Sequence, residues 1–206
     1  MHKSLLLLTF SLFLLGTGKA AVAVGSPAPG FTLNDLAGKP VQLSDYAGKI
    51  VVLEWTNVDC PFVKKHYASG NIPVLQEKYT AQGVVWLSVC SSAPGKEGNH
   101  PTQEIEATRA AWHAASTDYL VDADGIIGRL YGAKTTPHFF IVDKQGVVRY
   151  TGGIDSIASA NPDDIRKAEP YVAKALDALL AGKPVATPVT TPYGCSVKYG
   201  ALVPVP

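Results

Sequence analysis

Apolar residues along this chain follow a strand-like pattern in some segments and a helix-like pattern in others. The order of these segments predicts that strands alternate with helices. Near-continuous apolar runs predict two buried strands, at Ile50–Trp55 and Val84–Cys90. Shorter strands are expected at 119–121, 137–142 and 147–151. Helical patterns lie between them at 61–68, 72–82, 101–115 and 126–131, and a later one carries the apolar face of Val172, Leu176, Leu179 and Leu180. This alternation implies parallel strand pairing.

Two predicted hairpins modify the parallel pattern. Phe31–Leu33 and Val41–Leu43 alternate apolar and polar around a turn, which predicts an entry hairpin. The turn at Asp143-Lys-Gln-Gly146 favours an antiparallel pair late in the chain. The expected fold class is therefore α/β, a mixed sheet with helices on both faces. One domain is expected over residues 24–185, followed by a Pro/Thr-rich tail at 186–206.

The first residues are typical of a targeting segment. A short basic start, Met1-His-Lys3, precedes an apolar run over Leu5–Leu15 and an Ala-x-Ala site ending at Ala23. The apolar run is too short to span a bilayer. We expect residues 1–23 to be a cleavable signal peptide, which predicts a secreted or periplasmic protein without a stable membrane anchor. An uncleaved anchor is the alternative.

The composition of the chain limits which classes of partner it can bind and how many disulfides it can form. The chain has 206 residues, 47% of them hydrophobic and 17% charged, with a formal net charge of +1. The Lys and Arg residues are scattered rather than clustered, so no nucleic-acid partner is expected. Three cysteines, Cys60, Cys90 and Cys195, allow at most one intramolecular disulfide.

Cys60 stands where a reactive thiol is expected. It lies between the apolar strand ending at Trp55 and a helical segment that begins with Pro61. The N-terminus of a helix presents unpaired N–H groups and partial positive charge. That field favours the thiolate, which is the nucleophilic form of cysteine. We therefore predict that Cys60 is a redox or nucleophilic thiol.

A second motif, together with Cys60, marks a family resemblance. Lys134-Thr-Thr136-Pro137-His138 is followed by an apolar strand and Asp143-Lys-Gln-Gly146. With the Leu-Ser-Asp-Tyr46 segment upstream, residues 25–182 resemble redoxins of the alkyl hydroperoxide reductase and thiol-specific antioxidant superfamily, in a peroxiredoxin-like branch. The resemblance implies a thioredoxin-like fold and no organic cofactor. It also implies a peroxide or protein disulfide substrate and electrons from an external thiol reductant.

The same resemblance implies roles for two further residues. The Thr136–Pro137 bond would be cis and would lie beside Cys60, so that Pro137 shapes an edge on which an extended substrate could pair. A trans proline that opens a strand is the alternative. Glu54 corresponds to the buried acid of thioredoxins and could accept or deliver the thiol proton. A solvent-facing Glu54 is the other interpretation.

The sequence departs from both standard redox sites. A dithiol motif needs a second cysteine at Val63, and a peroxiredoxin would carry a hydroxyl residue at Asn57 and a proline at Leu53. Peroxiredoxins also place an activating arginine about where Pro137 falls. The expected site is therefore a solitary thiol, with neither motif complete.

The remaining candidates concern partners for Cys60. Cys195, in the tail, could resolve an oxidised Cys60, or it could be an unrelated tail thiol. Cys90 ends a buried strand and is expected to be a packed small hydrophobe. No metal site is predicted, because the fifth position from Cys60 is Lys64 where related copper proteins carry a second cysteine. A non-catalytic peptide-binding module is the second hypothesis, and a metallochaperone using Cys60, His66 and His138 is the third.

Overall fold

The computed structural model describes residues 22–201, so most of the predicted signal peptide, residues 1–23, lies outside the described residues. Seven strands form the main sheet, in the spatial order β2-β1-β5-β4-β3-β7-β8. Their bounds are β1 Thr32–Asp35, β2 Pro40–Gln42, β3 Val51–Trp55, β4 Val85–Cys90, β5 Asp118–Val121, β7 His138–Val142 and β8 Val148–Gly152. Two further strands, β6 Thr135–Thr136 and β9 Cys195–Ser196, form a small separate sheet.

The pairing confirms the predicted thioredoxin-like mixed sheet with an N-terminal hairpin. β3 pairs in parallel with β4, and β4 pairs in parallel with β5. β1 and β2 form the antiparallel entry hairpin, and β7 and β8 form the late one. The central strand β3 lies between β4 and β7, and all five of its residues are buried, as its continuous apolar run predicts.

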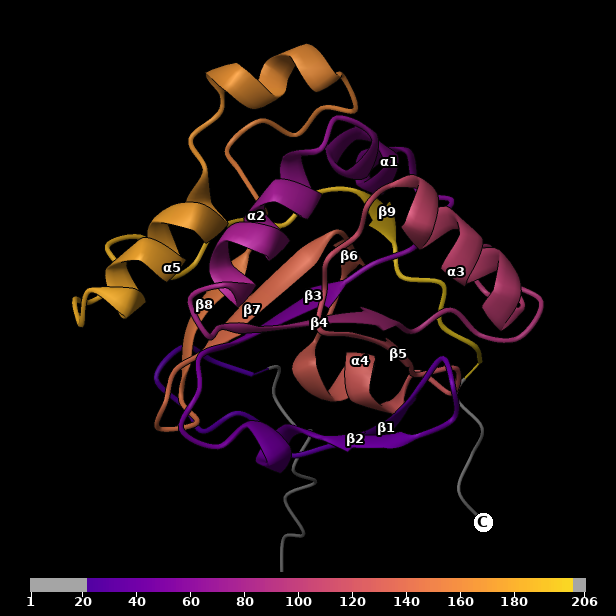
Figure 1. The fold of residues 1–206 in the computed structure, drawn as a ribbon, viewed down its shortest axis with the longest axis horizontal. Coiled ribbons are helices and arrows are strands. Elements are labelled where there is room, and N and C mark those ends of the chain that lie inside the picture. Colours follow the sequence, from indigo (N-terminus) through magenta and orange to yellow (C-terminus); the bar gives the residue numbers. More distant parts are fainter. Residues whose placement is uncertain (1–21, 202–206) are drawn as a thin grey trace, which may run out of the picture.

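Helices cover both faces of the sheet (Figure 1). The α-helices are α1 Pro61–Ala68, α2 Asn71–Thr80, α3 Thr102–Ala111, α4 Ile126–Tyr131 and α5 Tyr171–Leu180. Two short 3₁₀ segments occur at η1 Leu43–Tyr46 and η2 Pro162–Lys167. The segment 162–180 forms two separate elements, because η2 ends at Lys167 and Pro170 separates it from α5.

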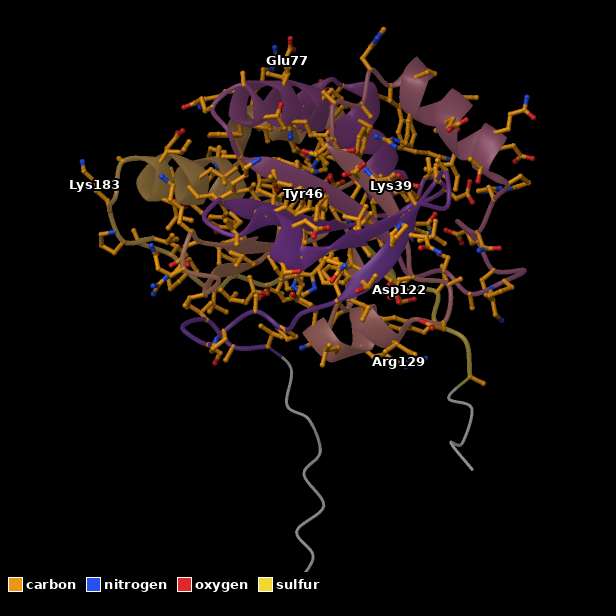
Figure 2. The ribbon with its side chains drawn as sticks, turned by 60° about the horizontal axis from the view of Figure 1, so that its bottom comes forward. Lys39, Tyr46, Glu77, Asp122, Arg129 and Lys183 are labelled. Carbon is orange, nitrogen blue, oxygen red and sulfur yellow. The ribbon has the colours of Figure 1, made fainter. Side chains whose placement is uncertain are left out.

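The alternation of side chains along β3 divides the core into two layers. Val52 packs with residues of α1, α2 and α5 on one face. Val51, Leu53 and Trp55 pack on the other face, where α4 contributes Tyr131. Side chains fill the space between helices and sheet, while Glu77 and Lys183 point outward (Figure 2). Glu54 therefore belongs to the layer under α1 and α2, because residues two apart in a strand share a face.

Within residues 22–201 we find no helix that is both long and apolar enough to cross a membrane.

Candidate active site

Cys60 lies at the N-terminal end of α1, directly after the loop that follows β3. Pro61 starts the helix, where its fixed φ suits the first turn and its missing N–H is not needed. The Cys60 side chain is fully buried, and its Sγ donates to the Thr136 carbonyl oxygen at 3.1 Å. The backbone N–H of Cys60 donates to the Asn57 carbonyl at 3.1 Å. The thiol is therefore held in one orientation against β6, the two-residue strand just before Pro137.

The loop before Cys60 is held in place by hydrogen bonds to the segment around Gly98. Asp59 accepts from the Gly98 N–H at 2.9 Å and forms a 2.6 Å contact with His100 Nε2. Burial opposes ionisation of Asp59, but the hydrogen bonds from His100 and Gly98 outweigh it and hold the pKa of this carboxyl below its usual value. Asn57, which replaces the hydroxyl residue of a peroxiredoxin, accepts from the Asp59 N–H at 2.8 Å. Asn57 thus has a structural role in shaping the loop.

The Thr136–Pro137 peptide bond is cis, as the resemblance implies. The two residues before it form β6, which pairs antiparallel with β9 of the C-terminal tail. In this register Thr136 lies opposite Cys195, and Thr135 lies opposite Ser196. The edge that Pro137 was expected to offer to a substrate is therefore occupied by the chain's own tail.

Cys195 packs beside Cys60, because its partner in the small sheet, Thr136, accepts the hydrogen bond of the Cys60 thiol. Desolvation by burial and the neighbouring Cys60 thiol raise the pKa of the Cys195 thiol well above its ordinary value. Cys195 is partly exposed, whereas Cys60 beneath it is fully buried. The two thiols are free rather than bonded. The structure thus brings together Cys60, Pro137 and Cys195.

Hydrogen bonds hold the Pro/Thr-rich tail along the domain at several points. Thr190 N–H donates to the Thr151 carbonyl at 3.0 Å at the edge of β8. Further on, Val197 N–H donates to the Lys134 carbonyl at 3.2 Å, and Tyr199 Oη donates to the Ala133 carbonyl at 2.9 Å. In Figure 1 the yellow segment runs from α5 past β9 beside β6. An alternating pattern over Tyr193, Cys195, Val197 and Tyr199 was the sequence signal for an extended, half-buried segment.

Glu54 is fully buried but forms no hydrogen bond with Cys60 in the described part of the chain. Its carboxylate accepts from Trp86 Nε1 at 2.7 Å and from Tyr67 Oη at 3.0 Å, with longer bonds from Gln76 and Ser88. Burial raises the pKa of Glu54 to about 7, although these hydrogen bonds lower it in part. The alternative of a solvent-facing Glu54 is therefore wrong.

The other candidate residues lie away from the thiol pair or are occupied by protein groups. Cys90 is buried against Ile105 and Tyr119, as expected for a packed small hydrophobe. Both ring nitrogens of His66 and of His138 have hydrogen-bond partners in the protein. Over residues 22–201 no group of three or more His, Cys, Asp or Glu side chains is arranged to hold a metal ion.

Comparison with known proteins gives consistent matches. The model of the AhpC/TSA family matches residues 24–151, a span that includes Cys60 and Pro137 but ends before Cys195. The thiol-disulfide oxidoreductase ResA of Geobacillus thermodenitrificans is 32% identical over 136 residues, which are 65% of this chain and 71% of that protein.

Two solved structures share the fold over most of the chain. An uncharacterized conserved protein from Geobacillus kaustophilus has a TM-score of 0.73 and 26% identity, and the match covers 88% of this chain and 94% of the other. A hypothetical protein from Sinorhizobium meliloti also has a TM-score of 0.73, with 24% identity over 89% of this chain and 98% of the other.

Proposed function

Because the chain belongs to the AhpC/TSA family, we propose that it is a thiol-disulfide oxidoreductase whose working dithiol is Cys60 and Cys195. The observation that carries this proposal is the position of the two thiols at Thr136: Cys60 Sγ donates to the Thr136 carbonyl, and Cys195 pairs with Thr136 in the small sheet and packs against the core cluster that contains Cys60. A Cys-x-x-Cys motif supplies both sulfurs from one helix end. Here the second sulfur comes from the C-terminal tail, which substitutes for the cysteine missing at Val63.

The proposed reaction is two successive thiol-disulfide exchanges. The Cys60 thiolate attacks one sulfur of a substrate disulfide, so that a mixed disulfide forms and the other substrate sulfur leaves as a thiolate. Cys195 then loses its proton and attacks the Cys60 sulfur, which releases the second substrate thiolate and forms a Cys60–Cys195 disulfide. The substrate gains two electrons and the protein loses two. An external thiol reductant returns the pair to the reduced state.

The raised pKa of Cys195 supports this division of roles. A thiol that keeps its proton is a poor first nucleophile. The proximity of Cys195 to Cys60 makes the Cys195 thiol effective in the second step, which is intramolecular. Pro137 and Thr136 form the backbone edge of the site. A role for Glu54 in moving the thiol proton stays a prediction, because the donors to its carboxylate are core side chains other than Cys60.

The surroundings of Cys60 favour a disulfide substrate over a peroxide. A peroxidase needs cationic or hydroxyl donors aimed at the peroxide oxygens. Arg149 is paired with Asp143, and Arg129 donates to the Gly200 carbonyl in the tail. Asn57 is engaged in the loop before Cys60. These residues are therefore committed to structural contacts.

Oxidation of the purified protein is expected to link Cys60 to Cys195. A mild disulfide oxidant should lower the mass by two hydrogens, and peptide mapping should find the two cysteines in one linked fragment. Cys90→Ser is the matched control and should form the same link. A chain that remains reduced, or that links only between molecules, would contradict the proposal and favour a non-catalytic peptide-binding module.

We also propose that the protein is exported after removal of residues 1–23. The basic start, the apolar run and the Ala-x-Ala site support this location, and an extracytoplasmic compartment is one in which disulfides persist. Mass spectrometry of protein recovered from the exported fraction should give an N-terminus at Val24. Retention of Met1 in that fraction would contradict cleavage.

A further inference from the structure

The segment Tyr193–Ser196, here called the tail strand, lies between α1, which contacts Tyr193, and β6, which pairs with Cys195 and Ser196; the space that it fills is here called the groove. Cys195 packs against the core cluster that contains the buried Cys60. While the tail strand is in place, no external disulfide has access to Cys60, because the Cys60 side chain has no exposed surface. Turnover on an external substrate therefore requires that the tail strand leave the groove.

At position 194, directly before Cys195, the groove has room only for glycine. Gly194 has a φ of +137°, and a Cβ at this position would lie 2.0 Å from the Thr136 carbonyl oxygen. That distance is far inside van der Waals contact, and the atom it meets is backbone. Any larger residue at this point must move the strand away from β6.

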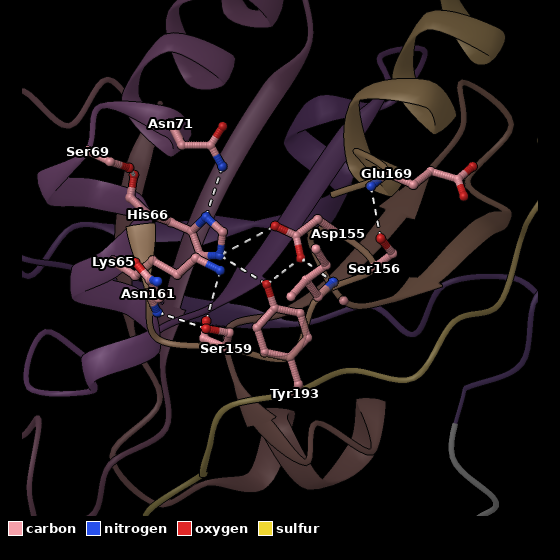
Figure 3. Close-up of polar contacts among 12 residues, drawn as sticks. Lys65, His66, Ser69, Asn71, Asp155, Ser156, Ser159, Asn161, Glu169 and Tyr193 are labelled. Atoms are coloured by element: carbon pink, nitrogen blue, oxygen red, sulfur yellow. Dashed lines mark hydrogen bonds and ion pairs between the residues drawn. The ribbon is translucent and has the colours of Figure 1, made fainter. Parts of the chain in front are cut away.

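The Tyr193 side chain is buried, and its hydroxyl lies among polar groups. Figure 3 shows it beside Lys65, His66 and Asp155, and Phe62 packs against its ring; these four residues are here called the phenol pocket. The ring packs edge-on against Phe62, with centroids 6.0 Å apart, and the Lys65 ammonium lies 5.8 Å from its centre. Tyr193 Oη donates to Asp155 Oδ1 at 2.6 Å and lies 3.1 Å from His66 Nε2.

The hydrogen-bond directions show why the hydroxyl matters. Asn71 Nδ2, which can only donate, lies 2.9 Å from His66 Nδ1, so Nδ1 accepts and Nε2 carries the proton toward Tyr193 Oη. Burial and the charge of Lys65 lower the pKa of His66 to about 3, which keeps this ring neutral. Asp155 is buried, and its Oδ1 also accepts from the Ile157 N–H at 3.0 Å. Its Oδ2 has no hydrogen-bond partner within residues 22–201, although His66 Nε2 lies 3.9 Å from it. Without the phenol, this buried carboxylate would lose the bond from Tyr193 Oη and keep only the one from Ile157.

We propose that the groove binds an extended polypeptide of another protein, in which a tyrosine and a glycine directly precede the reacting cysteine. This proposal rests on the proposed disulfide exchange. The tail strand, Tyr193-Gly194-Cys195, is the internal stand-in for that ligand. A substrate protein displaces it, pairs with Thr135 and Thr136, and places its tyrosine in the phenol pocket. After mixed-disulfide formation the tail strand returns and Cys195 releases the product. Affinity comes from the backbone edge and selectivity from the phenol pocket.

The test uses the full-length chain with two substitutions, Gly194→Ala to lift the tail strand and Cys195→Ser to stop resolution. The substrate is the peptide Pro-Tyr-Gly-Cys-Ser-Val-Lys with its cysteine in a mixed disulfide with thionitrobenzoate. Transfer of the peptide to Cys60 is followed by mass spectrometry, alongside Tyr→Phe and Tyr→Ala peptides. The tyrosine peptide should react about tenfold faster than either analogue, because only its side chain can donate the hydroxyl hydrogen bond that Asp155 accepts from Tyr193.

Two controls separate this proposal from the proposed function. The symmetrical thionitrobenzoate disulfide, which needs no pocket, reports the reactivity of Cys60 alone, and Tyr193→Ala with Cys195→Ser is a second way to lift the tail. If this reagent reacts with Cys60 in neither double variant, the exchange function itself fails. If it reacts but the three peptides transfer at equal rates, exchange stands and the tyrosine selectivity is overturned.

Substitutions in the protein, rather than in the peptide, test whether the phenol pocket causes the difference between the peptide rates. Asp155→Asn in the same background should reduce the ratio of the tyrosine rate to the phenylalanine rate toward one, whereas Gly30→Ala, which meets open space, should leave it unchanged. An unchanged ratio with Asp155→Asn in a folded protein contradicts the role of the phenol pocket. A stable dimer of the wild-type chain, formed by exchanged tails, would overturn the foreign ligand in favour of a second copy of this chain.

Discussion

Replacement of Cys60 by serine is expected to abolish reduction of protein disulfides, with a loss of roughly three orders of magnitude or more. The serine hydroxyl is nearly isosteric and can still donate to the Thr136 carbonyl, so the fold should survive. It has no accessible anionic form at neutral pH and cannot open a disulfide. The measurement is insulin precipitation in the presence of dithiothreitol, with thermal unfolding as a check on folding.

Cys195→Ser is expected to behave differently from Cys60→Ser. The first exchange should still occur, and the mixed disulfide with substrate should accumulate because its resolving thiol is gone. Non-reducing gel electrophoresis followed by mass spectrometry should find the substrate on Cys60. Cys90→Ser, whose thiol packs in the core against Ile105, serves as the matched control and should retain turnover. Full activity in Cys60→Ser, or a trapped substrate on Cys90, would exclude the proposed dithiol.

Much of the fold was predictable because its strands and helices have strong local signals. The run at Val51–Trp55 and the proline after Cys60 were enough to predict β3, α1 and the thiol between them. The Thr136–Pro137 element was found by resemblance, and so was Glu54. These features depend on residues that are close in sequence, or on a motif whose residues lie at fixed intervals along the chain.

The alternation around Cys195 indicates an extended segment, but the partner of the tail strand could not be predicted in the same way. Its pairing with β6 joins Thr136 to Cys195, which are far apart in sequence, and each strand has two residues. The proline- and threonine-rich composition around it favours an irregular tail. The phenol pocket also joins α1 to the loop after β8 through Asp155 and Tyr193. A contact of this kind depends on the path of the folded chain, and no local periodicity encodes it.

Glu54→Gln is expected to change how stability depends on pH. Burial raises the pKa of Glu54 to about 7, from an ordinary value of 4.5. Between these two values the unfolded chain releases this proton while the folded chain keeps it. The contribution of Glu54 to the free energy of unfolding is therefore fully present below pH 4.5 and is lost as pH rises toward 7. The loss totals about 3 kcal/mol, from about 1.4 kcal/mol for each pH unit.

The glutamine variant should lack that loss, because a neutral amide cannot ionise. Its oxygen can still accept from Trp86 Nε1, and its amide can donate to the Tyr67 hydroxyl, so the buried cluster remains bonded. Urea unfolding at several values between pH 4.5 and 7.5 should show wild-type stability falling relative to the variant by about 3 kcal/mol.

Glu77→Gln on the exposed face of α2 supplies the matched control for the loss of one carboxylate. Titration of the other carboxyls is common to all three proteins and cancels in the difference between their stability curves. The curve of Glu77→Gln should therefore run parallel to that of the wild type. If the Glu54→Gln curve also runs parallel to the wild type, Glu54 is already ionised in the folded protein at pH 4.5. The hydrogen bonds from its four donor side chains would then outweigh its burial, and Glu54 could not serve as a proton reservoir near neutral pH.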